Sequence, residues 1–238
     1  MKRLLYFVFF FSPFQGFAQQ TIDVNKEQDA PNRRLFYVVG GMPFAIAKYV
    51  NVTEGSPYFK DEWMKGVVII ASGEQCDNRL LRLDLVSGEL HYLDSAGREM
   101  ITTEKVAEVI LKDTLFGKQY RFVNSFAIVV PGSEKSINGW YELLSQGTAT
   151  LFCKYQKDIE QDLPYGSSTY NEIIKTTKLY FLVYNKAFYN IKKIKDVPDI
   201  LSDKRTELIN YINNKNLSGK SESDFSSLID YYNSLHPR

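Results

Sequence analysis

Apolar and polar residues alternate with a period of two through much of residues 35–195, which is the pattern of half-buried β-strands. Leu81, Leu83 and Leu85 alternate with polar residues, and the unbroken apolar run Val67 to Ile70 is typical of a strand at the centre of a sheet. Short turns that contain glycine separate several of these runs, which predicts antiparallel pairing of neighbours. The predicted strands span residues 35–39, 44–52, 66–72, 81–85, 89–93, 99–101, 106–111, 119–123, 126–130, 148–155, 179–184 and 187–191.

Two segments interrupt this series. Residues 140–144 fit a helical turn and a strand equally well, so both alternatives stay open. Residues 156–174 are polar and contain Pro164 and Gly166, which predicts a long loop.

After Lys195 the apolar period changes from two to 3.6, which predicts helices. One interrupted helix or two short ones are expected first, with Ser202 as N-cap of the second. Ser221 to Asp224 then resembles a capping box. An apolar stripe follows it at Phe225, Leu228, Ile229, Tyr232 and Leu235.

These helices need a surface on which to bury their apolar faces, and the sheet is the available one. The predicted fold is therefore α+β: an antiparallel β-sheet meander, which can be curved, with C-terminal amphipathic helices packed on it. The predicted organisation is a segment 1–18 that is removed, a flexible lead-in 19–34, an antiparallel β domain 35–195 and docked helices 196–238.

The first eighteen residues have the pattern of a secretory signal peptide. Lys2 and Arg3 precede eight apolar residues, and the small residues Gly16 and Ala18 stand three and one positions before Gln19. Eight residues are too few for the roughly 20 that a membrane span needs, although a core strand or helix remains the alternative. We expect cleavage between Ala18 and Gln19, a secreted or periplasmic protein, and no transmembrane segment in the mature chain.

Charge and composition narrow the class of partner. The chain has 29 basic and 28 acidic residues, and two of the basic ones lie in the predicted signal, which leaves the rest with a net charge of about −1. Such a near-neutral chain has no general attraction to nucleic acid. The sixteen tyrosines and sixteen phenylalanines suit strands and core packing, and also suit platforms that bind sugars.

Cys76 and Cys153 are the only cysteines. In an exported protein such a pair can form one disulfide, which in the chain-entropy view would contribute about 4 kcal/mol. Cys153 also alternates with Leu151 and Tyr155 like an inward-facing strand residue, so a buried free thiol is the alternative.

Several motifs together resemble a known group of proteins. They are a strand that begins with glycine, a Leu-x-Leu-Asp strand, a Leu-Leu-x-x-Gly turn into a Leu-x-x-Lys strand, a late basic segment and a closing Tyr-Tyr-Asn. Here they stand at Gly66-Val67-Val68-Ile69, Leu81-Arg82-Leu83-Asp84, Leu143 to Lys154, Ile191-Lys192-Lys193-Ile194-Lys195 and Tyr231-Tyr232-Asn233. Residues 55–235 thus resemble uncharacterised signal-peptide-bearing proteins common in Bacteroidota. The resemblance implies the envelope of a Gram-negative cell and transfers no catalytic residue.

Histidines and cysteines are too few and too scattered for a zinc motif or a nucleophilic triad. His91 lies in a predicted strand, where a surface or cross-strand role is expected, and His236 is two residues from the end of the chain. Gly40-Gly41 matches no phosphate-binding loop. The sequence predicts no catalytic residue, no metal ligand and no cofactor.

Carboxylates in the predicted loops are the candidates for acid–base chemistry on glycans. They are Asp61 and Glu62 beside Trp63, and Glu74 near Asp77. A second acidic group, Asp158, Glu160 and Asp162, has the alternating spacing of a calcium loop. It fails the EF-hand pattern because Leu163 and Thr169 stand where glycine and glutamate are needed.

The densest basic cluster comprises Lys186, Lys192, Lys193 and Lys195, which fits either contact with anionic head groups or glycans or a solvated sheet edge. The leading expectation is an exported cell-envelope protein that acts as a non-catalytic binding or scaffold module. Its partner would be an envelope protein, a glycan or a lipid. A soluble carrier of a lipid or other apolar ligand, and a glycan hydrolase that uses loop carboxylates, remain the alternatives.

Overall fold

The computed structural model describes residues 39–44, 48–128, 138–166 and 168–236. The predictions of a signal peptide at 1–18, with cleavage between Ala18 and Gln19, and of a lead-in at 19–34 lie outside these residues.

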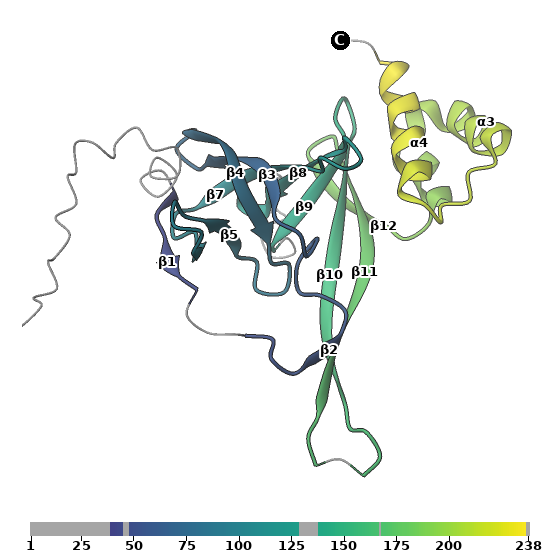
Figure 1. Ribbon diagram of the computed structural model, residues 1–238. Helices are drawn as coiled ribbons and strands as arrows, with labels where there is room; N and C mark the ends of the chain where they lie inside the picture. Colours follow the sequence, from purple (N-terminus) through teal and green to yellow (C-terminus); the bar gives the residue numbers. More distant parts are fainter. Residues whose placement is uncertain (1–38, 45–47, 129–137, 167, 237–238) are drawn as a thin grey trace, which may run out of the picture.

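The described residues form one open sheet of twelve strands, and helices follow it at the C-terminal end (Figure 1). The order across the sheet is β1-β6-β5-β4-β3-β7-β8-β9-β10-β11-β12, and every neighbouring pair in this path is antiparallel. The strands are β1 (Met42–Pro43), β2 (Val52–Glu54), β3 (Met64–Ile70), β4 (Gln75–Leu83), β5 (Leu90–Leu93), β6 (Glu99–Ile101), β7 (Val106–Lys112), β8 (Gln119–Asn124), β9 (Trp140–Ser145), β10 (Thr150–Asp162), β11 (Asn171–Tyr184) and β12 (Ala187–Ile191).

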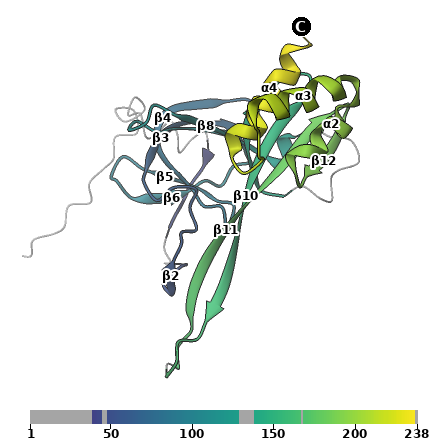
Figure 2. The same cartoon turned by 90° about the vertical axis from the view of Figure 1, so that its right-hand side faces the viewer.

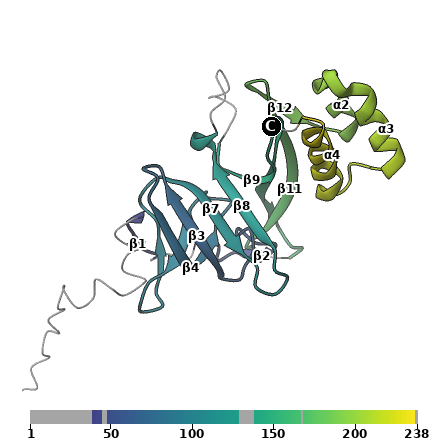
Figure 3. The same ribbon diagram turned by 90° about the horizontal axis from the view of Figure 1, so that it is seen from above.

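The sheet curves around its main core (Figure 3). Inward-facing residues from β3 to β8 pack there with Trp140 of β9, and Val68, Leu81 and Leu111 are fully buried. The Trp140 Nε1 donates to the backbone oxygen of Gly88, in the turn between β4 and β5, at 2.9 Å. This bond joins strands that lie far apart in the order of the sheet.

The C-terminal helices cover the β10–β12 end of the sheet (Figures 1 and 2). A second core forms there, in which Leu151 and Leu182 of the sheet pack with Leu208, Phe225 and Tyr232 of the helices. The helical elements are η2 (Ile194–Asp196), α2 (Val197–Ile200), η3 (Ser202–Lys204), α3 (Arg205–Lys215) and α4 (Glu222–Ser234). Among the described residues no helix is both long and apolar enough to cross a membrane.

Strands β10 and β11 continue well beyond the sheet as a two-stranded arm (Figures 1 and 2). They pair in continuous register from Thr150↔Val183 to Asp162↔Asn171. The prediction of a loop over 156–174 is therefore wrong, and a turn is confined to the stretch between the two strands. Alternation of apolar residues marks a strand only where one face is buried, and the side chains of β10 from Asp158 to Asp162 and of β11 from Lys175 to Lys178 are exposed.

Strand β2 departs from the antiparallel prediction. It pairs in parallel with β11 at Glu172↔Val52 and Ile173↔Glu54, so the sheet is mixed. The strand predicted over 44–52 is a turn at residues 48–51, and only Val52–Glu54 is extended. Residues 45–47 lie outside the description.

Four further local predictions can be compared with the structure. Residues 140–144 form a strand, β9. Residues 125–127, at the start of the strand predicted over 126–130, form a 3₁₀ turn because pairing with β9 ends at Asn124↔Trp140. Ser221 caps α4 as predicted, since its Oγ accepts from the Asp224 N–H at 3.2 Å. Ser202 instead begins a 3₁₀ turn, and α3 starts at Arg205 with no side-chain cap.

Candidate functional site

The outer arm presents apolar side chains to solvent. Ile159, Leu163 and Tyr170 are about half exposed, and Tyr165 at the tip is fully exposed. These four residues, which we call the arm tip, lie within 12 positions of each other on the projecting ribbon (Figure 2). Apolar side chains that project from the body of the molecule expose apolar area to water, which is unfavourable unless another surface covers them.

The segment that contains β2 supports one side of the arm. The Glu172 N–H donates to the Asn51 oxygen at 2.9 Å, and Ile174 is buried beneath this segment. Gly55 lies so close to the arm that a Cβ on it would stand 2.1 Å from the Ile174 oxygen. Lys157 of β10 donates to the Ser56 oxygen at 2.8 Å. The arm is therefore anchored along β11 and near Lys157.

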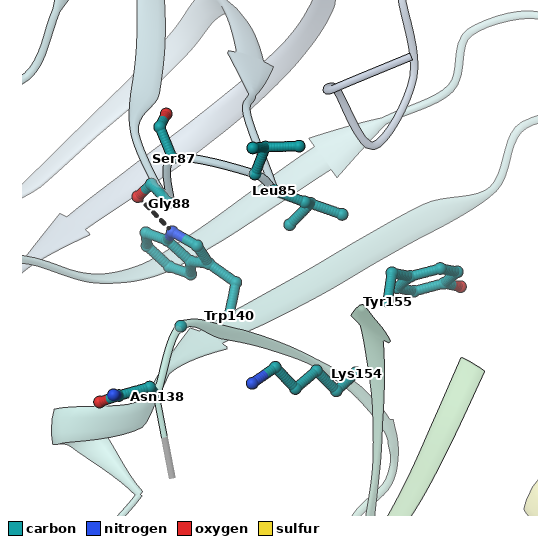
Figure 4. Close-up of a pocket in the computed structure, with 9 residues that line it drawn as sticks. Leu85, Ser87, Gly88, Asn138, Trp140, Lys154 and Tyr155 are labelled. Atoms are coloured by element: carbon teal, nitrogen blue, oxygen red, sulfur yellow. Dashed lines mark hydrogen bonds between the residues drawn. The ribbon is translucent and has the colours of Figure 1, made fainter. Parts of the chain in front are cut away.

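The turn between β4 and β5 borders a cavity of about 290 Å³ (Figure 4). Residues 85–88 form one side, and Trp140 and Lys154 form the other. Burial lowers the pKa of Lys154. Its Nζ lies 5.5 Å from the centre of the Tyr141 ring, so the ammonium is held near an aromatic face. The cavity is small for a bound organic ligand.

Three potential metal ligands meet beside this turn. Asp84 follows β4, Glu89 precedes β5 and His91 lies within β5; one ligand atom from each lies within 4.8 Å of the others. The pairing register of β4 and β5 explains why these three side chains lie close together. Arg82 pairs with His91 and Leu83 with Leu90, which places Asp84 opposite Glu89, and His91 is two residues from Glu89 and so shares its face.

Each carboxylate of this group has other partners. The Asp84 Oδ1 accepts from the Val86 and Ser87 N–H groups, and its Oδ2 accepts from the Tyr49 hydroxyl at 2.7 Å. The Glu89 Oε2 accepts from the Ser87 hydroxyl at 3.0 Å and forms an ion pair with Lys48. Burial by itself raises the pKa of Glu89, but the Lys48 and Ser87 contacts outweigh it and lower the pKa.

His91 is completely buried, so of the two expected roles the surface position is wrong; the residue pairs across the strands with Arg82 and Ile101. Its Nδ1 lies 2.5 Å from Glu99 Oε1, and Glu99 also accepts from Arg82 at 2.8 Å. The ring is covered by Phe44 and Tyr58, with ring centres 5.0 and 5.8 Å away. The Nε2 faces Glu89 and has no hydrogen-bond partner among the described residues.

A second buried polar cluster joins the sheet to α4. Tyr155 of β10 donates to Glu142 Oε2 at 2.5 Å and lies 3.1 Å from Glu222 Oε2, at the start of α4. Lys178 and Lys118 pair with Glu222 at 3.0 and 3.3 Å. Burial raises the pKa of Glu142, whereas for Glu222 the two lysines overcome the effect of burial and lower it.

The carboxylates considered for glycan hydrolysis are not gathered in one site. Asp61 and Glu62 precede β3, whereas Glu74 and Asp77 lie beyond its other end, and all four are exposed. Asp61 accepts from Ser56, and Glu62 lies 3.6 Å from Lys60. The structure therefore provides no paired acid and base from these residues.

Cys76 and Cys153 are both buried, and the structure has them as free thiols. Burial, with the nearby Glu142 and Glu222 charges, raises the pKa of Cys153 to about 12. Such a thiol is a poor nucleophile at neutral pH.

The lysines of the basic cluster, Lys186, Lys192, Lys193 and Lys195, are exposed in and around β12 and η2. A cavity of about 270 Å³ near the helices is lined by Lys195, Pro198, Ile209, Ile212 and Asn213. These residues all belong to the helical region, whereas the interface between helices and sheet is formed by the packed side chains of the second core. The lipid carrier thus gains no support from this cavity.

Sequence reasoning missed two groups, and one of them had a detectable signal. Asp84, Glu89 and His91 flank a turn, and pairing them across a hairpin would have placed all three on one face. Glu142 and Glu222 are 80 positions apart and meet only because α4 docks on β9 and β10.

A scan against protein-family models, curated proteins and solved structures finds no match to this chain.

Proposed function

We infer that this chain is an exported, non-catalytic binding protein that holds a protein partner through its β10–β11 arm. The observation that carries the proposal is the arm tip, which places four exposed apolar side chains on a ribbon that projects from the sheet (Figures 1 and 2). Its export is supported by the signal-peptide pattern of residues 1–18, and the partner would then be an envelope or extracellular protein.

The edge of β10 supports binding by a protein rather than by a small molecule. Strand β9 pairs with β10 only at Leu151, Phe152 and Cys153, so no described strand pairs with the outer edge of β10 beyond Cys153. Unpaired backbone N–H and C=O groups on such an edge can accept a strand from another chain. A two-stranded ribbon is marginally stable in water, and an added strand would stabilise it.

Site-specific photo-cross-linking tests the proposal. A benzoylphenylalanine replaces Tyr165 at the arm tip, and the full chain is expressed in cells that export it. The matched control carries the same group at Phe116, which is 82% exposed on the turn between β7 and β8. We expect a discrete protein adduct from position 165 that position 116 does not give.

A double variant, Leu163→Ser with Tyr170→Ser, should reduce formation of that adduct at least tenfold while the protein stays folded by circular dichroism. If the adduct consists of two copies of this chain, light scattering should show a dimer that the double variant loses. Equal labelling from positions 165 and 116, or no adduct from 165, would overturn the proposal.

A further inference from the structure

We propose that Asp84, Glu89 and His91 form a binding site for a divalent first-row transition metal, with zinc as the preferred ion. The three side chains bring one imidazole and two carboxylates to one face of the β4–β5 hairpin, with their ligand atoms within 4.8 Å of one another. Imidazole nitrogen together with carboxylate oxygen is a ligand set that zinc accepts. The proposal is independent of the function assigned to the arm.

The observation that points to a ligand is that His91 Nε2 is buried and has no hydrogen-bond partner among the described residues. Glu99 holds the other nitrogen at 2.5 Å, and since an ionised carboxylate can only accept, the Nδ1 carries a proton. In the neutral imidazole the Nε2 then presents a lone pair. This nitrogen is completely buried and has no hydrogen-bond partner among the described residues. A buried acceptor without a donor is costly, and a bound cation would remove that cost.

A charged imidazolium would form an ion pair with Glu89 but would still leave its Nε2–H without a hydrogen bond. Its Nε2–H would point to the Glu89 Oε2 at 3.6 Å, which is too long for a hydrogen bond. The same distance suits shared coordination, because two ligands of a tetrahedral zinc at about 2.1 Å stand about 3.4 Å apart. The distance between His91 Nε2 and Glu89 Oε2 therefore agrees better with coordination of one metal ion by both atoms than with a direct hydrogen bond between them.

Glu99 supplies the support that metal-binding histidines ordinarily have. A carboxylate on the far nitrogen fixes the tautomer, orients the ring and makes the coordinating nitrogen more basic. Arg82 holds Glu99 in turn at 2.8 Å, and the guanidinium lies 3.9 Å from the centre of the Tyr58 ring. The ring orientation of His91 is thus determined by groups on three sides.

Three protein ligands leave a fourth position of a tetrahedral ion for water or another ligand. Glu89 is the exposed member of the site, with 29% of its side chain accessible, so ions would enter from its side. Lys48 occupies the same carboxylate oxygen and competes with a metal for it. Asp84 keeps lone pairs for coordination although its oxygens accept from Tyr49 and two backbone N–H groups.

Calorimetric titration of zinc chloride into the chelator-treated mature chain tests the proposal. We expect one zinc per chain with a dissociation constant below about 10 μM. His91→Gln should weaken binding at least 100-fold, and Glu99→Gln about 10- to 100-fold through loss of orientation. Lys48→Met should strengthen binding. His236→Gln removes the only other histidine and should leave the affinity unchanged.

Nuclear magnetic resonance provides a second readout, in which the residues of the proposed site are left unchanged. The chain has two histidines, so their imidazole ¹⁵N signals can be assigned from the His236→Gln spectrum. Zinc should shift the His91 Nε2 signal at one equivalent, and magnesium should not. Failure to bind zinc, binding that survives His91→Gln and Glu89→Gln, or an unshifted Nε2 signal would overturn the proposal.

Discussion

The side-chain amide of Asn233 pairs with both backbone groups of Ala149. The Ala149 N–H donates to Asn233 Oδ1 at 2.9 Å, and the Asn233 Nδ2 donates to the Ala149 oxygen at 2.9 Å. Asn233 thus takes the place of a strand neighbour at the turn between β9 and β10. Gly147 makes room for it, because a Cβ there would lie 2.4 Å from the Asn233 Cγ. Helix α4 is therefore joined to the sheet by hydrogen bonds as well as by apolar packing.

Replacing Asn233 by aspartate should destabilise the protein by about 1–3 kcal/mol. The donor to the Ala149 oxygen is lost, and a carboxylate oxygen then faces that carbonyl. Urea unfolding followed by circular dichroism measures the loss. The control, Asn214→Asp, changes an exposed side chain of α3 and should shift the free energy of unfolding by less than about 0.5 kcal/mol. Equal losses in both variants would contradict this role of Asn233.

Replacing Glu142 by glutamine should stabilise the protein at pH 7 by on the order of 1 kcal/mol. Burial raises the pKa of Glu142 above its ordinary value in the folded state. The folded chain then binds more protons than the unfolded chain in that pH range, so the ionised carboxylate lowers stability as pH rises through the folded pKa. The Tyr155 hydroxyl can still donate to the glutamine oxygen.

The pH dependence separates this effect from a change in packing. The gain from Glu142→Gln should be complete above the folded pKa and should disappear below about pH 4, where the carboxyl is protonated in both states. Urea unfolding between pH 3.5 and 8 measures it. The exposed Glu62→Gln serves as control and should show no such trend. A gain that is independent of pH would count against a charged Glu142 as its cause.

Both cysteines should be unreactive in the native protein and reactive after unfolding. Cys76 and Cys153 are buried, and the raised pKa of Cys153 keeps that thiol protonated. Ellman's reagent should detect no rapid thiol under native conditions and two thiols per chain in guanidinium chloride without reductant. No thiols in the unfolded, unreduced protein isolated after export would mean that the two cysteines are joined.

Leu151→Ala should cost about 2–5 kcal/mol because the side chain is fully buried between the sheet and the helices. Leu163→Ala makes the same chemical change at the half-exposed arm tip and should alter the free energy of unfolding by less than about 0.5 kcal/mol. Chemical denaturation compares the two. Similar losses would mean that the arm tip is packed rather than free to bind.

Much of the fold could be predicted because burial leaves a pattern in the sequence. The central strands and the apolar stripe of α4 each bury one face or more, and their alternation was visible. The outer arm was not predictable from this signal, since Gln156 on one face and Thr176 on the other are both exposed to solvent. The parallel pairing of β2 with β11 joins residues about 120 positions apart, and no local pattern encodes it.

The candidate sites were less accessible to sequence reasoning than the fold. The arm tip lies in the segment expected to be a loop, so its apolar residues had no predicted context. His91, flanked by Leu90 and Tyr92 in a predicted strand, was expected to be a surface or cross-strand residue, and neither alternative predicted its complete burial. The structure covers both faces of β5, with Phe44 and Tyr58 on the His91 side. His91 is buried because the segment before β3, which carries Phe44 and Tyr58, passes over this face of β5.

The parallel contact between β2 and β11 has a consequence for the order in which the chain assembles. The β10–β11 hairpin is closed by a short connection and can form from nearby residues within microseconds. The third strand that pairs with this hairpin, β2, belongs to a segment that leaves the ribosome more than a hundred residues earlier. We expect the arm to gain its rigidity late in folding, when the early part of the chain returns to it. Truncations before residue 55 would then soften the arm while sparing the helices.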